Sequence, residues 1–202
     1  MIAIIDYNVG NLHNLKNALD YQGLPNAFAR RPEELAGFDH IILPGVGAFG
    51  PAMDHLRQVE MEAAARERVT AGVPFLGVCV GMQLLFDWSE EDGRHQGLGL
   101  IKGRVVRFAH ALKIPQIGWN QVALQREDPL VQDVPDQSYF YFVHSYHPVL
   151  DDPRNALGLT DYGVVFPSIV ARGNVWGVQF HPEKSQNAGL RLLKNFASIQ
   201  PA

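Results

Sequence analysis

Residues 74–83 read Pro-Phe-Leu-Gly-Val-Cys-Val-Gly-Met-Gln, and they contain the only cysteine of the chain, Cys79. The uninterrupted apolar run 73–78 is typical of a strand buried in a parallel sheet. Gly77 and Gly81 stand two residues before and after Cys79, as a sharp turn from strand to helix requires, because larger side chains would collide there. The segment therefore predicts a nucleophile at the carboxyl end of a strand, where open α/β sheets bind their ligands.

An apolar run at residues 1–5 comes earlier, and residues 39–43 are expected to form a further buried strand. Segments with helical spacing follow the three strands, over residues 12–19, 48–72 and 82–88. Asn11 is placed to cap the first of these helices. Strands that alternate with helices over the first half of the chain predict a parallel α/β sheet.

The second half of the chain is richer in β-forming residues. Strands are expected over residues 101–108, 138–149, 164–171 and 175–180, and a closing helix over residues 188–199. Residues 172–174, Arg-Gly-Asn, predict a tight hairpin turn. Without an internal repeat or a linker, residues 1–202 are expected to form one α/β domain, a mostly parallel open sheet flanked by helices with an antiparallel β extension.

The composition limits the function classes. A chain of 202 residues with 47% hydrophobic and 19% charged residues is expected to bury a core, and a net charge of −4 gives no basic footprint for nucleic acid or an anionic membrane. One cysteine excludes an intramolecular disulfide and a zinc site of several thiolates. The first apolar run is too short for a signal peptide, and no run reaches the length of a membrane span, so a cytoplasmic protein is expected.

A histidine and a carboxylate that could serve the cysteine lie in the segment 175–183, Val-Trp-Gly-Val-Gln-Phe-His-Pro-Glu. Pro182 ends the expected strand and fixes the backbone, so that His181 and Glu183 can face the same way. A catalytic thiol needs an imidazole to move its proton, and the imidazole needs a carboxylate to orient it. A buried cysteine is more often a core residue, and the chain has eight histidines, so the pattern alone leaves a structural role open.

The two segments together resemble the signatures of class I glutamine amidotransferases, G-x-C-x-G-x-Q at residues 77–83 and F-H-P-E at residues 180–183. The resemblance implies a flavodoxin-like fold and a triad of Cys79 (nucleophile), His181 (base and acid) and Glu183 (orienting carboxylate). It also implies hydrolysis of L-glutamine to glutamate and ammonia through a cysteine thioester, with no metal or organic cofactor.

Further segments are similar to the branch of this family that serves imidazole glycerol phosphate synthase in histidine biosynthesis. They cover residues 6–12, 43–49, 115–120 and 141–146. Asn8 stands where that branch often has glycine, and asparagine tolerates a left-handed backbone better than most residues. The resemblance implies a heterodimer with a cyclase (synthase) subunit, a (β/α)₈ barrel, which uses the ammonia to form imidazole glycerol phosphate and an aminoimidazole carboxamide ribotide.

Individual roles carry over to the matching positions. The backbone N–H of Val80 is expected to face the developing oxyanion. By resemblance, the loop at Val46 and Gly47 supplies a second oxyanion donor. Two glycines, Gly45 and Gly47, let this backbone rotate, and in the family the donor N–H is misaligned until the partner enzyme has bound its ligand. The expected substrate residues are Gln83, His144, Ser145 and Tyr146, and the expected partner contacts are Tyr7, Asn11, Trp119 and Asn120.

Other readings remain open at this point. The chain could be the glutaminase of pyridoxal phosphate synthase or of another synthase, although the Asp-Tyr segment at residues 6–12 and Gly-Trp-Asn at residues 118–120 argue against both. It could be a cysteine peptidase or esterase of related architecture, active without a partner. A catalytically silent binding module is disfavoured by the intact Cys, His and Glu.

Overall fold

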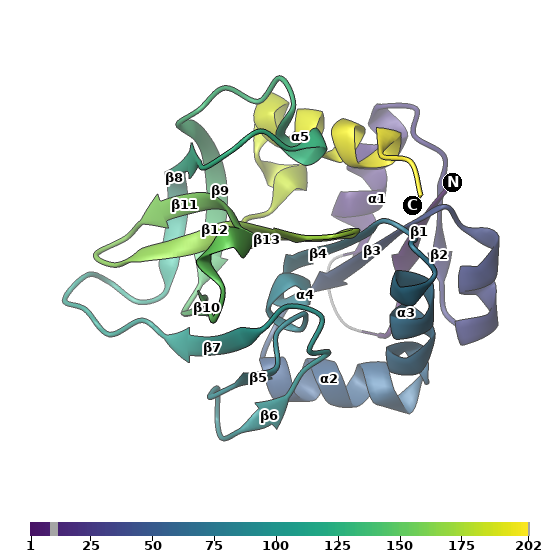
Figure 1. Ribbon diagram of the computed structural model, residues 1–202, viewed down its shortest axis with the longest axis horizontal. Helices are drawn as coiled ribbons and strands as arrows, with labels where there is room; N and C mark the ends of the chain where they lie inside the picture. The colour runs from purple at the N-terminus through teal and green to yellow at the C-terminus, as the bar shows by residue number, and fades with distance from the viewer. Residues whose placement is uncertain (9–11, 202) are drawn as a thin grey trace.

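The computed structural model describes residues 1–8 and 12–201. Its central sheet lies between helices α1 (Leu12–Tyr21) and α5 (Gln186–Ser198) on one side and α2 (Phe49–Gln58) and α3 (Met61–Thr70) on the other (Figure 1). Asn11, predicted as a helix cap and as a partner contact, lies outside the described residues. The layered α/β architecture that the alternating pattern predicts is confirmed.

Among the described residues, the strands form a nine-stranded sheet and a four-stranded sheet. The parallel half of the large sheet has the order β2-β1-β3-β4-β13, which is the 2-1-3-4-5 order of flavodoxin-like folds. These strands are β1 (Ile2–Ile5), β2 (Asn26–Ala29), β3 (His40–Gly45), β4 (Phe75–Cys79) and β13 (Val175–Val178). All residues of β1, β3, β4 and β13 are buried, because helices cover both faces.

The antiparallel half continues the large sheet from β13 through β12, β11, β8 and β9. These strands are β12 (Val165–Arg172), β11 (Ala156–Asp161), β8 (Gln116–Leu124) and β9 (Ser138–His144). The predicted hairpin turn is confirmed, since Arg172 pairs with Val175 and Gly173 has a φ of +59°. Strands β2, β8 and β11 were not among the predicted strands.

The strand predicted over residues 138–149 is broken at Ser145. Strand β9 ends at His144 in the large sheet, and β10 (Tyr146–Leu150) pairs with β7 (Gly103–Arg107) in the small sheet. The small sheet is completed by β5 (Trp88–Ser89) and β6 (His95–Gln96). One predicted strand therefore joins two sheets, and the junction lies at a predicted substrate residue.

Two helical predictions need correction. The stretch 48–72 is two helices, because Glu60 adopts a left-handed φ of +57° between α2 and α3. The helix predicted over residues 82–88 is wrong beyond its first two residues, since α4 (Val80–Gln83) ends at Gln83. The backbone carbonyls of residues 84–86 accept hydrogen bonds from the N–H groups of residues 98–101, which replace the next helical turn. The short 3-10 helices are η1 (Pro32–Gly37), η2 (Pro129–Val131), η3 (Pro153–Asn155) and η4 (Pro182–Lys184).

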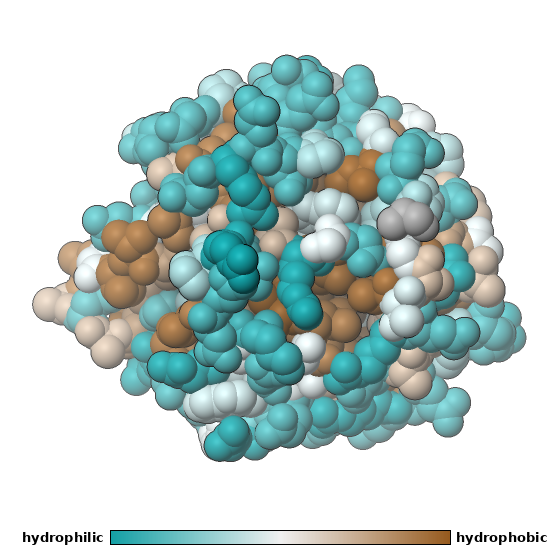
Figure 2. All heavy atoms as spheres, viewed as in Figure 1, coloured by the Kyte–Doolittle hydropathy of each residue, from teal (hydrophilic) through white to brown (hydrophobic). Residues whose placement is uncertain are grey.

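The surface differs between the two halves of the molecule. In Figure 2 hydrophilic side chains cover the lower edge, where α2 and β6 lie in Figure 1, and apolar side chains gather on the left, where β11 and β12 lie. Val164 and Val165 are among the exposed apolar residues of that hairpin. In the described part of the chain, helices long and apolar enough to span a membrane are absent.

The glycines around the cysteine are required by close backbone packing. A Cβ atom on Gly81 would lie 1.9 Å from the carbonyl oxygen of Leu43, and one on Gly77 would lie 2.5 Å from the carbonyl oxygen of Gly81. Real Cβ atoms do not approach backbone atoms this closely, so β3 and the turn after β4 can touch only through glycine. The predicted need for small residues on both sides of Cys79 is confirmed.

We expect Gly77→Ala to lower the free energy of unfolding by about 3 kcal/mol or more, because the clashing atoms belong to the backbone and cannot rotate away. The measurement is urea-induced unfolding followed by circular dichroism. Gly37→Ala is the matched control, since a Cβ there would meet no described atom within 4 Å, and its effect should stay below about 1 kcal/mol. Equal losses in the two variants would contradict the packing argument.

Candidate active site

Cys79 sits in a strained turn at the end of β4. Its φ of +56° and ψ of −116° are rare for a residue with a side chain, and α4 begins at the next residue. The turn holds the sulfur at the carboxyl edge of the parallel strands, as the sequence predicts. Because α4 has only four residues, its dipole contributes less to a thiolate than the longer helix predicted there would.

His181 and Glu183 form a close pair beside this turn. Nδ1 of His181 lies 2.9 Å from Oε1 of Glu183, and both side chains are buried. Pro182 opens η4, and the N–H of His181 donates to the carbonyl oxygen of Tyr141, which fixes the backbone at the ring. With Nδ1 bound to the carboxylate, Nε2 is the remaining ring nitrogen, and His181 lines the same cavity as Cys79. The structure thus brings the three predicted catalytic residues together.

The electrostatics of His181 favour its charged form. Burial alone lowers the pKa of His181, but the hydrogen bonds and charges of Cys79 and Glu183 outweigh it and raise the pKa to about 10. At neutral pH the ring therefore carries two protons. An imidazolium beside a cysteine favours the thiolate and can later protonate a leaving amine.

A cavity of about 400 Å³ opens in front of the cysteine. Cys79 and His181 line it at the carboxyl ends of the parallel strands. The predicted oxyanion residues Val46, Gly47 and Val80 also line it. So do the predicted substrate residues Gln83, His144, Ser145 and Tyr146. Its size suits a small ligand such as an amino acid.

The loop after β3 is tight at one glycine and open at another. A Cβ on Gly45 would lie 2.6 Å from the backbone N of Gly81, so this part of the loop packs against the cysteine turn. Gly47 has a φ of +85°, and a Cβ there would meet no described atom within 4 Å. The loop can therefore present a backbone N–H beside Cys79 and has room to rotate at Gly47.

Gln83 is buried, and its amide nitrogen donates to the carbonyl oxygen of Tyr146 at 3.2 Å and to Oε1 of Gln179 at 3.1 Å. In this structure the side chain of Gln83 braces the pocket wall between β10 and the chain that leads to His181. Burial of Gln83 excludes a solvent-facing position on α4 for this side chain.

His144 supports the same wall as a neutral ring. Nδ1 of His144 donates to the carbonyl oxygen of Tyr146 at 2.7 Å, and Nε2 lies 2.9 Å from the side chain of Gln116. Burial, helped by the charges of His147 and His181, lowers the pKa of His144 to about 4 despite the hydrogen bond to Tyr146. His144 therefore shapes the backbone at residues 144–146.

The predicted partner contacts fare differently. Tyr7 is fully buried, and its hydroxyl donates to the carbonyl oxygen of Pro44 at 2.8 Å, so the prediction that Tyr7 anchors a partner is wrong for its side chain. Burial, together with the charge of Cys79, raises the pKa of Tyr7, which keeps the hydroxyl a donor. Trp119 is 46% exposed. Asn120 is partly buried and donates to the carbonyl oxygen of Asp161.

Two further residues line the cavity, Glu91 and Lys184, and neither was predicted from the sequence as a site residue. Oε2 of Glu91 accepts a hydrogen bond of 2.8 Å from the N–H of Phe49, the first residue of α2, and burial raises the pKa of Glu91. Glu91 belongs to the acidic run 90–92, which by pattern alone is typical of a solvated turn. Among the residues that the structure describes, no group of three His, Cys, Asp or Glu side chains could hold a metal ion.

The α/β fold and the site are typical of one class of protein, the enzymes that cleave an amide through a cysteine acyl-enzyme. Within this class, the model of the family "Glutamine amidotransferase class-I" matches residues 3–199. The chain therefore belongs to the class I glutamine amidotransferases.

Curated relatives match over nearly the whole chain. The chain is 48% identical to "Imidazole glycerol phosphate synthase subunit HisH" of Sulfurimonas denitrificans over 99% of both sequences. It is 49% identical to the protein of the same name from Desulfitobacterium hafniense, over 97% of this chain and 93% of the relative. The protein of that name from Salinibacter ruber is 46% identical over 98% and 94%.

Solved structures share the fold. "Structure of PurLQS from Thermotoga maritima" superposes with a TM-score of 0.77 at 17% identity over 96% of each chain. "Crystal structure of glutamine amidotransferase" superposes with a TM-score of 0.74 at 22% identity, over 98% of this chain and all of the other. At these identities the likeness establishes the fold alone, and it agrees with the predicted amidotransferase architecture.

We expect Glu183→Gln to lower the pKa of His181, because the amide removes a charge and a strong acceptor from Nδ1. The folded-state pKa of His181, about 10, lies above its ordinary value of 6.5. Protonation of His181 therefore stabilises the fold fully below pH 6.5, and this contribution is lost as the pH rises through 10. In Glu183→Gln the loss should be smaller and end at a lower pH. Unfolding free energies measured across this range, with NMR titration of the ring, check both points; an unchanged titration of His181 contradicts them.

Proposed function

We propose that the chain is the glutamine-hydrolysing subunit of an imidazole glycerol phosphate synthase. The observation that carries the proposal is the convergence of Cys79 and His181 on one cavity beside a glycine-containing backbone loop, with Glu183 bound to Nδ1 of His181. The names of relatives at 46–49% identity support the choice of synthase.

The chemistry follows from the positions of the proton and the charges. The thiolate of Cys79 attacks the side-chain amide carbon of L-glutamine, and the backbone N–H groups of Val80 and of the loop at Gly47 bind the oxyanion. The imidazolium of His181 gives its proton to the amide nitrogen, which leaves as ammonia and leaves a γ-glutamyl thioester. Water then attacks the thioester, His181 takes its proton, and glutamate and the thiolate are released.

The amino-acid end of the substrate would lie at the far wall of the cavity. The backbone at residues 144–146, held by Gln83, offers peptide groups to the substrate. Glu91 brings a carboxylate to the same cavity, and it complements the α-ammonium group of glutamine. We therefore add Glu91 to the proposed substrate residues.

The docking face for the cyclase barrel is proposed on β8 and β9. Ile117 pairs with Val143 and Trp119 with Tyr141, so these side chains point to one face. Ile117, Trp119 and Val143 are exposed by 59%, 46% and 36%, and Val143 also lines the cavity. Exposed apolar side chains that gather beside an active site mark an interaction surface, with tryptophan a frequent anchor.

The test of the activity is glutamate release from L-glutamine by the chain alone and with a cyclase barrel and its ligand. We expect strong stimulation by the loaded partner, and Cys79→Ala should reduce the rate by about 10⁴-fold or more, because the nucleophile is lost. Cleavage of peptides or esters without a partner would instead favour an independent cysteine hydrolase. Ammonia release that survives in Cys79→Ala would overturn the mechanism.

The docking face has its own test. We expect Trp119→Ala to weaken binding of the cyclase by about 30-fold, because a buried tryptophan anchor contributes about 2 kcal/mol or more. Isothermal titration calorimetry measures the dissociation constant. Tyr21→Ala is the matched control, since Tyr21 is 81% exposed on α1, outside the β8–β9 face. Equal affinities for Trp119→Ala and the unchanged chain would rule out this face.

A further inference from the structure

The proposed oxyanion loop is held by one side chain at each end. Before the loop, the hydroxyl of Tyr7 donates to the carbonyl oxygen of Pro44 at 2.8 Å. After the loop, the N–H of Phe49 donates to Oε2 of Glu91 at 2.8 Å. These two hydrogen bonds bracket residues 45–48, of which Val46 and Gly47 line the cavity next to Cys79.

The Tyr7 end is held by close packing at Tyr7 and Gly45. Tyr7 is fully buried, and Gly45 lies so close to the cysteine turn that a Cβ on it would meet the backbone N of Gly81 at 2.6 Å. The hydroxyl of Tyr7 therefore ties the start of the loop to the part of the core that also sets the position of Cys79.

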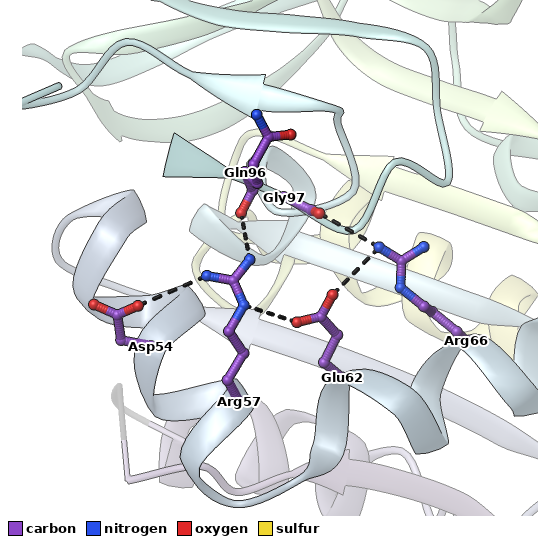
Figure 3. Close-up of polar contacts among 6 residues, drawn as sticks. All are labelled: Asp54, Arg57, Glu62, Arg66, Gln96 and Gly97. Carbon is purple, nitrogen blue, oxygen red and sulfur yellow. Dashed lines mark hydrogen bonds and ion pairs between the residues drawn. The ribbon is translucent and has the colours of Figure 1, made fainter. Parts of the chain in front are cut away.

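The Glu91 end is rigid because the β5–β6 hairpin is clamped to two helices (Figure 3). The guanidinium of Arg57 on α2 donates to the carbonyl oxygen of Gln96 at 2.9 Å, and that of Arg66 on α3 donates to Gly97 at 3.4 Å. Glu62 lies between the two arginines and binds both.

The same hairpin also packs against the start of α2. A Cβ on Gly50 would lie 2.8 Å from the ring of His95, so the ring rests directly on the helix backbone. The hairpin and the start of α2 therefore hold each other in place, and Glu91 stays next to Phe49.

Between the two fixed ends, Gly47 has open space and a positive φ. We propose that Tyr7 and Glu91 are positioning residues that confine movement of the loop to residues 45–48 and so align its N–H with the oxyanion. The inference rests on the proposed glutaminase activity. It also gives Glu91 two separable tasks, since its charge faces the substrate ammonium while its oxygen holds Phe49.

The experiment compares Glu91→Ala, Glu91→Gln and Tyr7→Phe in the complex with the loaded cyclase, with L-glutamine as substrate. Glutamine at position 91 keeps an acceptor for Phe49, so kcat should stay within about twofold while KM rises about 10-fold or more through the lost charge. Alanine at position 91 removes both the charge and the acceptor for Phe49. In this variant kcat should therefore also fall by about 10-fold or more, toward the 10²–10³-fold cost of losing one oxyanion donor. Tyr7→Phe should lower kcat by about 10-fold with KM within about twofold.

Alkylation of Cys79 by iodoacetamide separates positioning from general damage. The reaction needs the thiolate but no oxyanion donor, so its rate should stay within about twofold in all three variants. Glu90→Ala is the matched control on the same hairpin and should keep both kcat and KM.

Three results would overturn the inference: unchanged kcat in Glu91→Ala and Tyr7→Phe, an equal fall of kcat in Glu91→Gln and Glu91→Ala, or alkylation rates that fall together with kcat. Failure of the unchanged complex to hydrolyse glutamine would instead refute the proposed function.

Discussion

The contact between two backbones at Gly81 is the constraint on which the site depends. The carbonyl oxygen of Leu43 occupies the space that a side chain on Gly81 would fill. Only this approach allows the end of β3 to lie against the cysteine turn, with Gly45 paired to Cys79. The loop that follows β3 is consequently beside the sulfur before any substrate arrives, and a glycine without a side chain is what makes the arrangement possible.

His181 lies beside Cys79 because the strand that precedes it, β13, pairs with β4. Strand β13 pairs in parallel with β4, so that Gly177 lies opposite Gly77 and Val178 opposite Val78. The chain continues past β13 for three residues to His181, which places the ring beside the residue that follows Val78 on β4. The segment around Cys79 and the segment that contains His181 and Glu183 are far apart in the chain, and this strand pairing brings them together at one edge of the sheet.

The sequence predicted the parts of the molecule where one physical rule dominates. Buried strands such as β1 (Ile2–Ile5) are uninterrupted apolar runs, and the glycines around Cys79 reflect steric necessity, so both were predicted correctly. The helix predicted over residues 82–88 ends at Gln83, because the carbonyls of residues 84–86 accept from the N–H groups of residues 98–101, a pairing that no local pattern reveals. The break at Ser145 was missed for the same reason, since it depends on which sheet each half joins.

The residues of the site divide in the same way, into those that a local motif predicts and those that only the fold brings together. Its catalytic side chains lie in short motifs that sequence reasoning can find, whereas Glu91 enters the cavity because a hairpin folds back onto α2. Tyr7 was assigned to the surface from its motif, but the hydroxyl needs the carbonyl of Pro44, and burial of the ring follows.

Strand β9 ends the nine-stranded sheet among the described residues, and Tyr139 and Val143 on it are exposed. An edge strand of a sheet can pair with a strand of another chain, and exposed apolar side chains on it favour that association. We expect this chain to aggregate when it is produced in excess of the partner that covers β9. Cells that express it would therefore gain from synthesising it in step with whatever molecule covers that edge.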